Sequence, residues 1–467
     1  MDSIDNIMVD ICNREIQSKL LSIRIDGIPV YYYVRRYTRI EILKQHGHNI
    51  AVKHPPVEFL EHCKSVIKSI FQISKLLLSR KKYDIFIYSF GRPDKVNGIY
   101  MDKFTDPLIE ESNIGNSYVV FEPSRAWKHL TPRMHKDNVI YSDAIYWMGN
   151  NMWKFYKKRY EKRNRNELIS LYEELVRTFP EVKYNFDSIV SIIIRNYLYY
   201  KYFHNILKRI EAKSLVAPSR ADFYHIIPVA KKLNMKVIEL QHGITYGETP
   251  TYSGFNDILF SPDYFLSFGN VHSANCYGIS DDKVFEIGWA FNNYIQKLKK
   301  GNEDVSKIKV LVISSPSISE KMVSVTCMFA EKHPDIHFYF RPHPSEQLDG
   351  NRLNRLNSCP NITIDNNQEN VMVTILMFDN VMGENSTVLY EALSMGKKVG
   401  KVQMEGLEPR YLTEDDKSFF YQITDDYTFM DFIKASLDAK PSKKLYTEFK
   451  SEVINQLLED NKYAYAK

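Results

Sequence analysis

Short apolar runs and stretches of helical spacing alternate along most of this chain. Residues 214–219 and 235–240 are runs of the first kind, and the apolar positions between them, in 220–233, are spaced as in a helix. Short apolar runs predict buried strands, and a strand–helix–strand order predicts a parallel sheet covered by helices. The predicted fold class is therefore α/β.

The same pattern continues on both sides of this strand–helix–strand unit. Further strands are predicted at 83–89, 116–121, 263–269, 309–313, 338–341 and 377–382. A polar, lysine-rich stretch, 292–307, separates the two groups, and a chain of 467 residues is too long for one ordinary core. We expect a first domain over residues 1–295 and a second domain over residues 305–440.

The first 166 residues contain several further segments with a clear pattern. Residues 1–22 predict an amphipathic helix, and residues 28–34 predict an extended run that leads into Arg35 on a solvated basic face. Residues 57–80 predict a surface helix, with a weakly membrane-facing helix as the alternative. The Lys-, Arg- and Tyr-rich stretch 153–166 is interpreted as a solvated helix face or as a patch for a membrane or a lipid-linked acceptor.

Composition narrows the function classes. The net charge of +5 is only mildly basic, so it is compatible with an anionic substrate or a lipid surface and does not indicate nucleic acid. Five scattered cysteines without a Cys-x-x-Cys pair fit a reducing cytosol. The chain lacks a signal-like start and any run of ~18 apolar residues. We expect a cytoplasmic protein, with peripheral association at the inner face of the cell membrane left open.

Candidate chemistry begins where the strand at 338–340 ends, at Arg341-Pro342-His343-Pro344. Each proline removes a backbone donor and pushes the preceding residue toward extended geometry. Arg341 and His343 are therefore expected at the carboxyl end of a strand, where open α/β sheets bind ligands. A rigid turn without a ligand is the alternative interpretation.

A second candidate lies after the strand at 377–382. Ser386 and Thr387 are cap-type residues before a helix that runs to Met395. A helix amino terminus suits a phosphate, and Glu391, one turn further on, could accept hydrogen bonds from a ribose diol. The two motifs together predict a nucleotide site; a simple helix cap is the alternative.

Further candidates follow other strands. Ser314 and Ser315 could contact a phosphate or a donor sugar, or form an ordinary serine turn. In the first half, His242, in Gln241-His242-Gly243, could act as a general base or serve a structural role. Other base candidates are Asp102, Asp106 and Glu122, and Asp106 could instead cap the helix that Pro107 begins.

On His343-Pro344 and Ser386-Thr387 the chain resembles the donor half of GT-B glycosyltransferases that build bacterial surface polysaccharides such as capsule and O-antigen. In the sialyltransferase-like and Kdo-transferase-like branches, these two motifs hold the CMP part of the donor. A related pattern of UDP-sugar enzymes, in which the glutamate holds ribose, is matched by Gly383, Ser386, Glu391 and Ala392.

CDP-glycerol polymerases share an arginine-x-histidine-proline pattern, matched here by Arg341, His343 and Pro344, and a His-Gly motif with a base-like histidine, matched by His242. The resemblance covers about residues 215–400. It implies two Rossmann-like domains facing a central cleft, with the donor on the second domain and the acceptor on the first. It also implies that Arg35 could face the cleft and that residues 445–467 could return to complete the first domain.

The expected function is transfer of a sugar from a nucleotide-activated donor to a glycan or lipid-linked oligosaccharide. A CMP-activated Kdo or sialic acid is the first donor expected, and a UDP-sugar is the second. The chain has no Asp-x-Asp, so we expect no metal and no other cofactor, with Arg341, His343 and a helix dipole stabilising the leaving phosphate. The alternatives are a CDP-polyol phosphotransferase of the same fold and a non-catalytic subunit of polysaccharide assembly.

Overall fold

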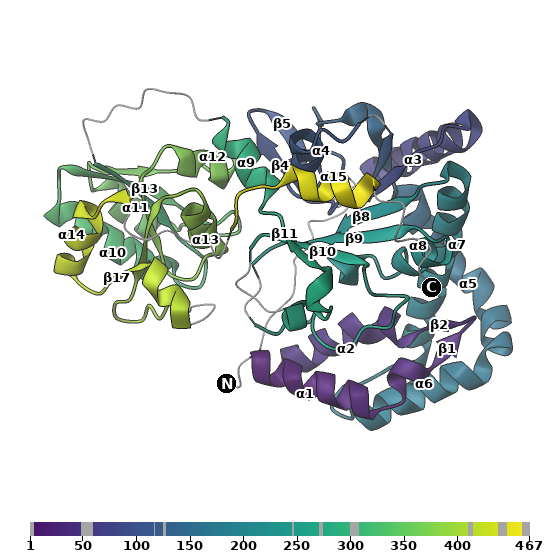
Figure 1. Ribbon diagram of the computed structural model, residues 1–467. Coiled ribbons are helices and arrows are strands. Elements are labelled where there is room, and N and C mark those ends of the chain that lie inside the picture. The colour runs from purple at the N-terminus through teal and green to yellow at the C-terminus, as the bar shows by residue number, and fades with distance from the viewer. Residues whose placement is uncertain are drawn as a thin grey trace.

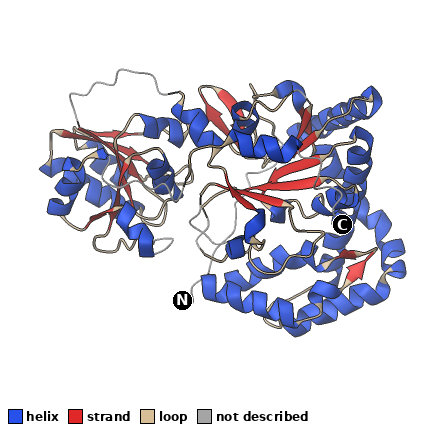
Figure 2. Cartoon of the chain, viewed as in Figure 1, coloured by secondary structure: helices blue, strands red, loops and turns tan. Residues whose placement is uncertain are grey.

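The computed structural model describes residues 4–47, 59–115, 117–124, 128–244, 247–269, 274–298, 308–409, 414–437 and 446–459. These residues build two parallel sheets, each with helices on its faces (Figures 1 and 2). The expected domain boundary near residue 305 lies outside the described residues.

In the described residues, the first sheet has seven strands in the order β11-β10-β9-β8-β3-β6-β7, and all neighbouring strands are parallel. The strands are β3 (Ile85–Tyr88), β6 (Tyr118–Glu122), β7 (Val139–Tyr141), β8 (Ser214–Pro218), β9 (Lys236–Leu240), β10 (Tyr264–Ser267) and β11 (Val284–Glu286). Strands β3, β6 and β8 are buried at every position, as expected for parallel strands covered on both faces.

Two groups of helices cover this sheet. One face packs against α3 (Phe59–Ser79), α5 (Asp143–Arg163), α7 (Phe186–Ile210) and α8 (Ile227–Lys232). The other face packs against α4 (Asp106–Glu111), α9 (Ala290–Gln296) and α15 (Ser451–Glu459). The predicted strand–helix–strand unit is therefore present as β8, α8 and β9.

A separate helical layer has its own hydrophobic core. It contains α1 (Ile4–Gln17), the hairpin of β1 (Arg24–Ile25) and β2 (Ile28–Pro29), α2 (Tyr31–Gln45) and α6 (Arg165–Thr178). The predicted extended run over 28–34 is wrong beyond Pro29, because α2 begins at Tyr31. Arg35 on α2 is buried against Glu15, so it lies neither on a solvated face nor in a cleft.

The second sheet has six strands within the described residues, in the order β14-β13-β12-β15-β16-β17, again all parallel. The strands are β12 (Ile308–Ile313), β13 (Ile336–Arg341), β14 (Ile362–Ile364), β15 (Asn380–Gly383), β16 (Lys398–Val402) and β17 (Tyr421–Ile423). The helices are α10 (Ser319–Lys332), α11 (Gly350–Asn357), α12 (Val371–Leu376), α13 (Thr387–Ser394) and α14 (Asp426–Lys434). The strand predicted over 377–382 begins later, at Asn380, because α12 continues to Leu376.

The chain returns to the first domain at its end. The backbone N–H of Thr447 donates to the carbonyl of Phe268 at 2.8 Å, and Ile454 and Leu457 of α15 join the first hydrophobic core. Gly288 permits this approach because its φ is +76° and a Cβ there would collide with the carbonyl of Thr447. Figure 1 shows α15 against the first domain, far along the chain from its other elements.

The predicted fold class is confirmed: the chain forms two Rossmann-like parallel-sheet domains. All five cysteines lie in the described residues, none forms a disulfide, and Cys12, Cys327 and Cys359 are buried. No helix among the described residues has both the length and the apolar character needed to cross a bilayer.

Candidate active site

A pocket of about 340 Å³ is lined by both domains. The second domain contributes the ends of β12 and β13, the loop before α12 and the start of α13. The first domain contributes Phe291 and the hairpin of β4 (Pro93–Val96) and β5 (Ile99–Asp102), with Lys103 just after it. Ligand pockets in proteins commonly have volumes of about 300–1,000 Å³, so this one can hold a small molecule.

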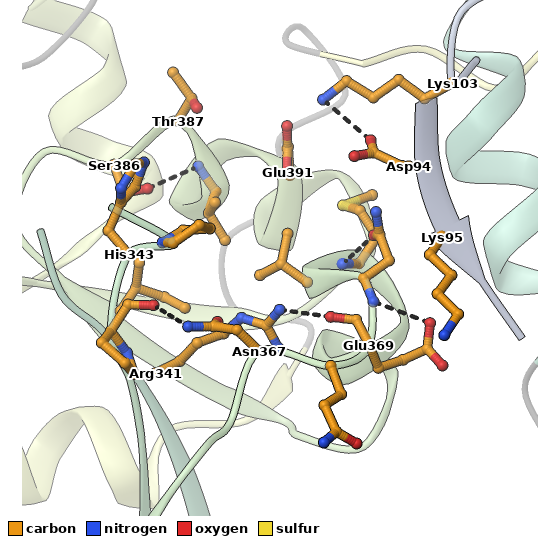
Figure 3. A pocket seen from close by; sticks show the side chains of 18 of the residues that line it. Asp94, Lys95, Lys103, Arg341, His343, Asn367, Glu369, Ser386, Thr387 and Glu391 are labelled. Atoms are coloured by element: carbon orange, nitrogen blue, oxygen red, sulfur yellow. Dashed lines mark hydrogen bonds and ion pairs between the residues drawn. The ribbon is translucent and has the colours of Figure 1, made fainter. Parts of the chain in front are cut away.

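Arg341, at the end of β13, is buried and turned into its own domain. Its Nη1 lies 2.7 Å from both Asp365 Oδ2 and Thr374 Oγ1, and its Nη2 donates to the carbonyl of Glu369 at 2.6 Å. The guanidinium therefore holds the loop that forms one wall of the pocket (Figure 3). Its predicted contact with a donor phosphate stays a prediction.

His343 and Pro344 line the same pocket, and the imidazole is exposed. The backbone N–H of Ser345 donates to His343 Nδ1 at 3.1 Å, so a neutral ring carries its proton on Nε2. Nε2–H is thereby available as a donor to a ligand oxygen. The backbone N–H of His343 donates to Glu346 at 3.0 Å, which fixes the turn after β13.

The two serines after β12 differ in position. Ser314 lines the pocket and its hydroxyl donates to Glu346 at 3.0 Å, so Glu346 joins the exits of β12 and β13. Ser315 is half-buried, lies 3.3 Å from the hydroxyl of Ser317 and is not among the residues that line the pocket.

Helix α13 points its amino terminus at the pocket. Ser386 is its N-cap and accepts the N–H of Val388 at 3.2 Å, so part of its hydroxyl's capacity serves the helix. Thr387 is exposed at the pocket, and Glu391 stands on the same helix face one turn later. Gly383 allows β15 and β12 to lie close, because a Cβ there would be 2.9 Å from the carbonyl of Ile313.

The first domain supplies three charged residues to the pocket that the sequence interpretation missed: Asp94, Lys95 and Lys103. Lys103 Nζ lies 3.9 Å from Asp94, and Figure 3 shows both near Glu391 of the second domain. Burial raises the pKa of Glu391, and the cation of Lys103 acts in the opposite direction. The Asn97-Gly98 turn signal could have located the hairpin, but its approach to the second domain is a tertiary feature.

His242 lies at the end of β9, outside the set of residues that line the pocket. Its Nδ1 is hydrogen-bonded to the hydroxyl of Tyr252. The centroid of its imidazole ring lies 5.4 Å from the centroid of the Phe90 ring. Burial lowers the pKa of His242 to about 4, and the cations of Arg92 and Lys103 act in the same direction. The ring is therefore neutral near pH 7.

Asp102, one of the residues predicted to act as a base, is buried and surrounded by backbone N–H donors. It is 1 % exposed, and its carboxylate accepts backbone N–H groups from Phe90 at 2.6 Å, Phe104 at 3.0 Å and Thr105 at 3.1 Å. These donors occupy both oxygens, so Asp102 fastens β5 and the following turn to the end of β3. Its predicted role as a base stays a prediction.

The other two carboxylates proposed as bases are also enclosed. Asp106 is the first residue of α4, after the N-cap Thr105, and pairs with Arg133, so it does not serve as the cap. Glu122 is held by His129 Nδ1 at 2.9 Å and by Arg133 Nε at 2.7 Å. Both side chains are nearly fully buried, so these contacts tie β6 and α4 to the loop that carries His129 and Arg133.

No protein-family model and no curated protein matches the chain. Among solved structures, the UDP-GlcNAc 2-epimerase from Methanocaldococcus jannaschii is 13 % identical over 81 % of this chain and 99 % of its own, with a TM-score of 0.49. The UDP-GlcNAc 2-epimerase from Neisseria meningitidis bound to UDP-GlcNAc is 12 % identical over 80 % and 98 %, with a TM-score of 0.44. The wall teichoic acid polymerase TagF is 14 % identical over 85 % and 95 %, with a TM-score of 0.45.

Proposed function

We propose that this protein is a glycosyltransferase that binds a nucleotide-activated sugar in the pocket between its domains and transfers the sugar to a hydroxyl of a bacterial surface glycan or its lipid-linked precursor. One observation carries the proposal: His343, Thr387 and Glu391 line a single pocket, although they come from two different strand exits. A hydrogen-bond donor, a helix amino terminus and a carboxylate one turn later suit the phosphate and ribose of a nucleotide.

The donor would lie with its phosphate at the start of α13. The backbone N–H groups there, the Thr387 hydroxyl and His343 Nε2–H are donors for phosphate oxygens, and Lys95 and Lys103 add positive charge from the first domain. Glu391 would accept hydrogen bonds from the ribose hydroxyls. As the bond to the sugar breaks, these donors stabilise the negative charge that develops on the departing nucleotide.

The acceptor hydroxyl would approach from the first domain, where His242 is the base candidate that remains after Asp102, Asp106 and Glu122 are found enclosed. The Tyr252 hydroxyl is hydrogen-bonded to Nδ1. In the tautomer whose proton is on Nδ1, the Nε2 lone pair would take the proton of the acceptor hydroxyl. The hydroxyl oxygen then forms the new bond to the sugar carbon, and the nucleotide leaves with the bonding electrons.

A CMP-activated 2-keto acid such as Kdo or sialic acid is the first donor to test, because His343-Pro344 and Ser386-Thr387 match the motifs that hold CMP. UDP-sugars are the second. A thermal-shift screen with CMP, CDP, UDP, GDP and their sugars measures binding without any acceptor. Stabilisation by none of these nucleotides contradicts the proposal.

Turnover assays distinguish glycosyl transfer from polyol-phosphate transfer and from a non-catalytic role. Release of CMP or UDP from a sugar nucleotide, dependent on a lipid-linked acceptor, supports glycosyl transfer. Release of CMP from CDP-glycerol instead assigns polyol-phosphate transfer, and tight binding without turnover of any donor assigns a non-catalytic role. We expect EDTA to leave the rate intact, and a loss that Mg²⁺ or Mn²⁺ reverses contradicts metal-independent transfer.

A further inference from the structure

Helix α3 carries an apolar stripe on the side that faces away from the protein. Its inner side buries Ser65, Val66, Ser69 and Leu76. On the opposite side, Leu60, Ile67, Phe71 and Leu78 are 70, 67, 69 and 81 % exposed. Their spacing of seven, four and seven residues places them in one line along the helix. We call these four residues the outer stripe.

The outer stripe differs from the scattered apolar residues that every protein surface shows. Single exposed leucines are ordinary, but an aligned row of large apolar side chains marks an interaction surface. Phe59 and Ile70 widen the stripe on one side, with exposed fractions of 77 and 48 %. The inner side of α3 already packs on the sheet and on α5, so the outer stripe contributes nothing to the described core.

Positive charge lies along one side of the outer stripe and follows its end. Lys64, Lys68 and Lys75 lie together along its other side and are exposed, and Arg80-Lys81-Lys82 follows the helix directly. Between residues 59 and 82 the only acidic residue is Glu61, which pairs with Lys64 at 2.9 Å. Helix α5, packed beside α3, also exposes a large aromatic residue, Phe155, among lysines.

We propose that the outer stripe of α3 docks on an anionic lipid bilayer. Its apolar side chains would enter the boundary between head groups and acyl chains, while the flanking lysines meet the lipid phosphates. A second copy of this chain fits less well, because stacking two α3 helices would bring two sets of lysines together. Figure 1 shows α3 at the end of the first domain that points away from the second domain.

Cosedimentation of the full chain with lipid vesicles tests the apolar part of the surface. We expect binding to vesicles that contain phosphatidylglycerol and little binding to pure phosphatidylcholine. Ile67→Gln combined with Phe71→Gln should weaken vesicle binding about tenfold or more, because two large side chains no longer enter the interface. Tyr427→Gln is the matched control, since Tyr427 is 75 % exposed on α14 of the second domain.

Charge reversal tests the electrostatic part. Lys75→Glu should weaken binding to anionic vesicles about tenfold, whereas Lys434→Glu on α14 should leave it unchanged. Circular dichroism and thermal unfolding verify that each variant is folded, which their exposure predicts. The proposal is overturned if the wild-type chain ignores anionic vesicles, or if the double glutamine variant binds them as the wild type does.

Size-exclusion chromatography tests whether a second copy of this chain covers the outer stripe instead. A wild-type dimer that the Ile67→Gln and Phe71→Gln changes convert to a monomer would show that a second copy covers the outer stripe, and would overturn lipid docking. A wild-type elution volume that these changes leave unaltered supports it. Vesicle binding requires neither donor nor turnover, so its outcome is independent of the proposed transfer chemistry.

Discussion

The carboxylate of Glu15 lies 2.7 Å from the guanidinium of Arg35, and both side chains are 1 % exposed. Arg39 lies 2.8 Å from the same carboxylate, so one buried anion faces two buried cations. Both guanidiniums also donate to the carbonyl of Ser253, at 3.4 and 2.9 Å. This cluster therefore fastens α1 and α2 to the loop whose Tyr252 contacts His242.

Glu15→Gln should destabilise the fold by about 3–5 kcal/mol, because two buried guanidiniums lose their counter-charge. Chemical denaturation measures this loss. Asp10→Asn is the control: Asp10 pairs with Arg14 on the surface with a side chain 63 % exposed, and its removal should cost less than about 1 kcal/mol. Equal stabilities of the two variants would contradict the role assigned to the cluster.

The same cluster predicts a pH dependence of stability. Burial alone raises the pKa of Glu15, but Arg35 and Arg39 outweigh it and lower the pKa from 4.5 to about 2. A lowered carboxyl pKa stabilises the fold above the unfolded value and loses this contribution as pH falls from 4.5 toward 2. The contribution is about 3 kcal/mol, and the difference in unfolding free energy between wild type and Glu15→Gln should shrink over that range.

His343→Ala should weaken binding of the donor nucleotide about tenfold or more, because a hydrogen bond to a charged phosphate is lost. The stability should change by less than about 0.5 kcal/mol, since the imidazole is exposed. Isothermal titration with the best nucleotide of the thermal-shift screen measures the change. Ser345→Ala keeps the imidazole and should have a smaller effect; unchanged affinity in His343→Ala would remove His343 from the donor site.

His242→Ala should lower kcat about 100-fold or more while the Kd of the nucleotide changes less than about threefold. Because burial lowers the pKa of His242 to about 4, the rate should hold steady from pH 5 to 8 and decline as pH drops through 4. Tyr252→Phe removes the partner of Nδ1 and should give an intermediate loss. Near-normal turnover of His242→Ala would rule this histidine out as the base.

Glu391→Gln should reduce the preference for a ribonucleotide over its 2′,3′-dideoxy form about tenfold. Affinity for the dideoxy form is the internal control and should not change. Burial raises the pKa of Glu391 and Lys103 opposes this, so Lys103→Met should raise the pKa further. The ribose preference requires the ionised carboxylate, so it should be lost as the pH is lowered. In Lys103→Met this loss should begin at a higher pH than in the wild type.

Local signals in the sequence were sufficient to predict the end of β13 and the start of α13. Pro342 and Pro344 end β13 because neither can donate a backbone hydrogen bond, and Ser386 caps α13 by accepting an N–H two residues later. These interactions span only a few residues, so the pattern alone indicates where strand ends and helix starts lie. The parallel order of the sheets follows from the same alternation of strands and helices.

The burial and the partners of several charged residues could not be predicted from the sequence, because their partners lie far away along the chain. Arg35 was expected on a surface, but its partner Glu15 lies on another helix, and Asp102 was expected to act as a base, but backbone N–H groups enclose it. Lys103 reaches Glu391 across nearly three hundred positions of sequence. The sequence by itself thus determined where β13 ends and where α13 begins, because prolines and a helix cap act on their immediate neighbours. Only the tertiary structure decided which charges are buried, paired or free to meet a ligand, because burial depends on segments that come together only when the chain folds.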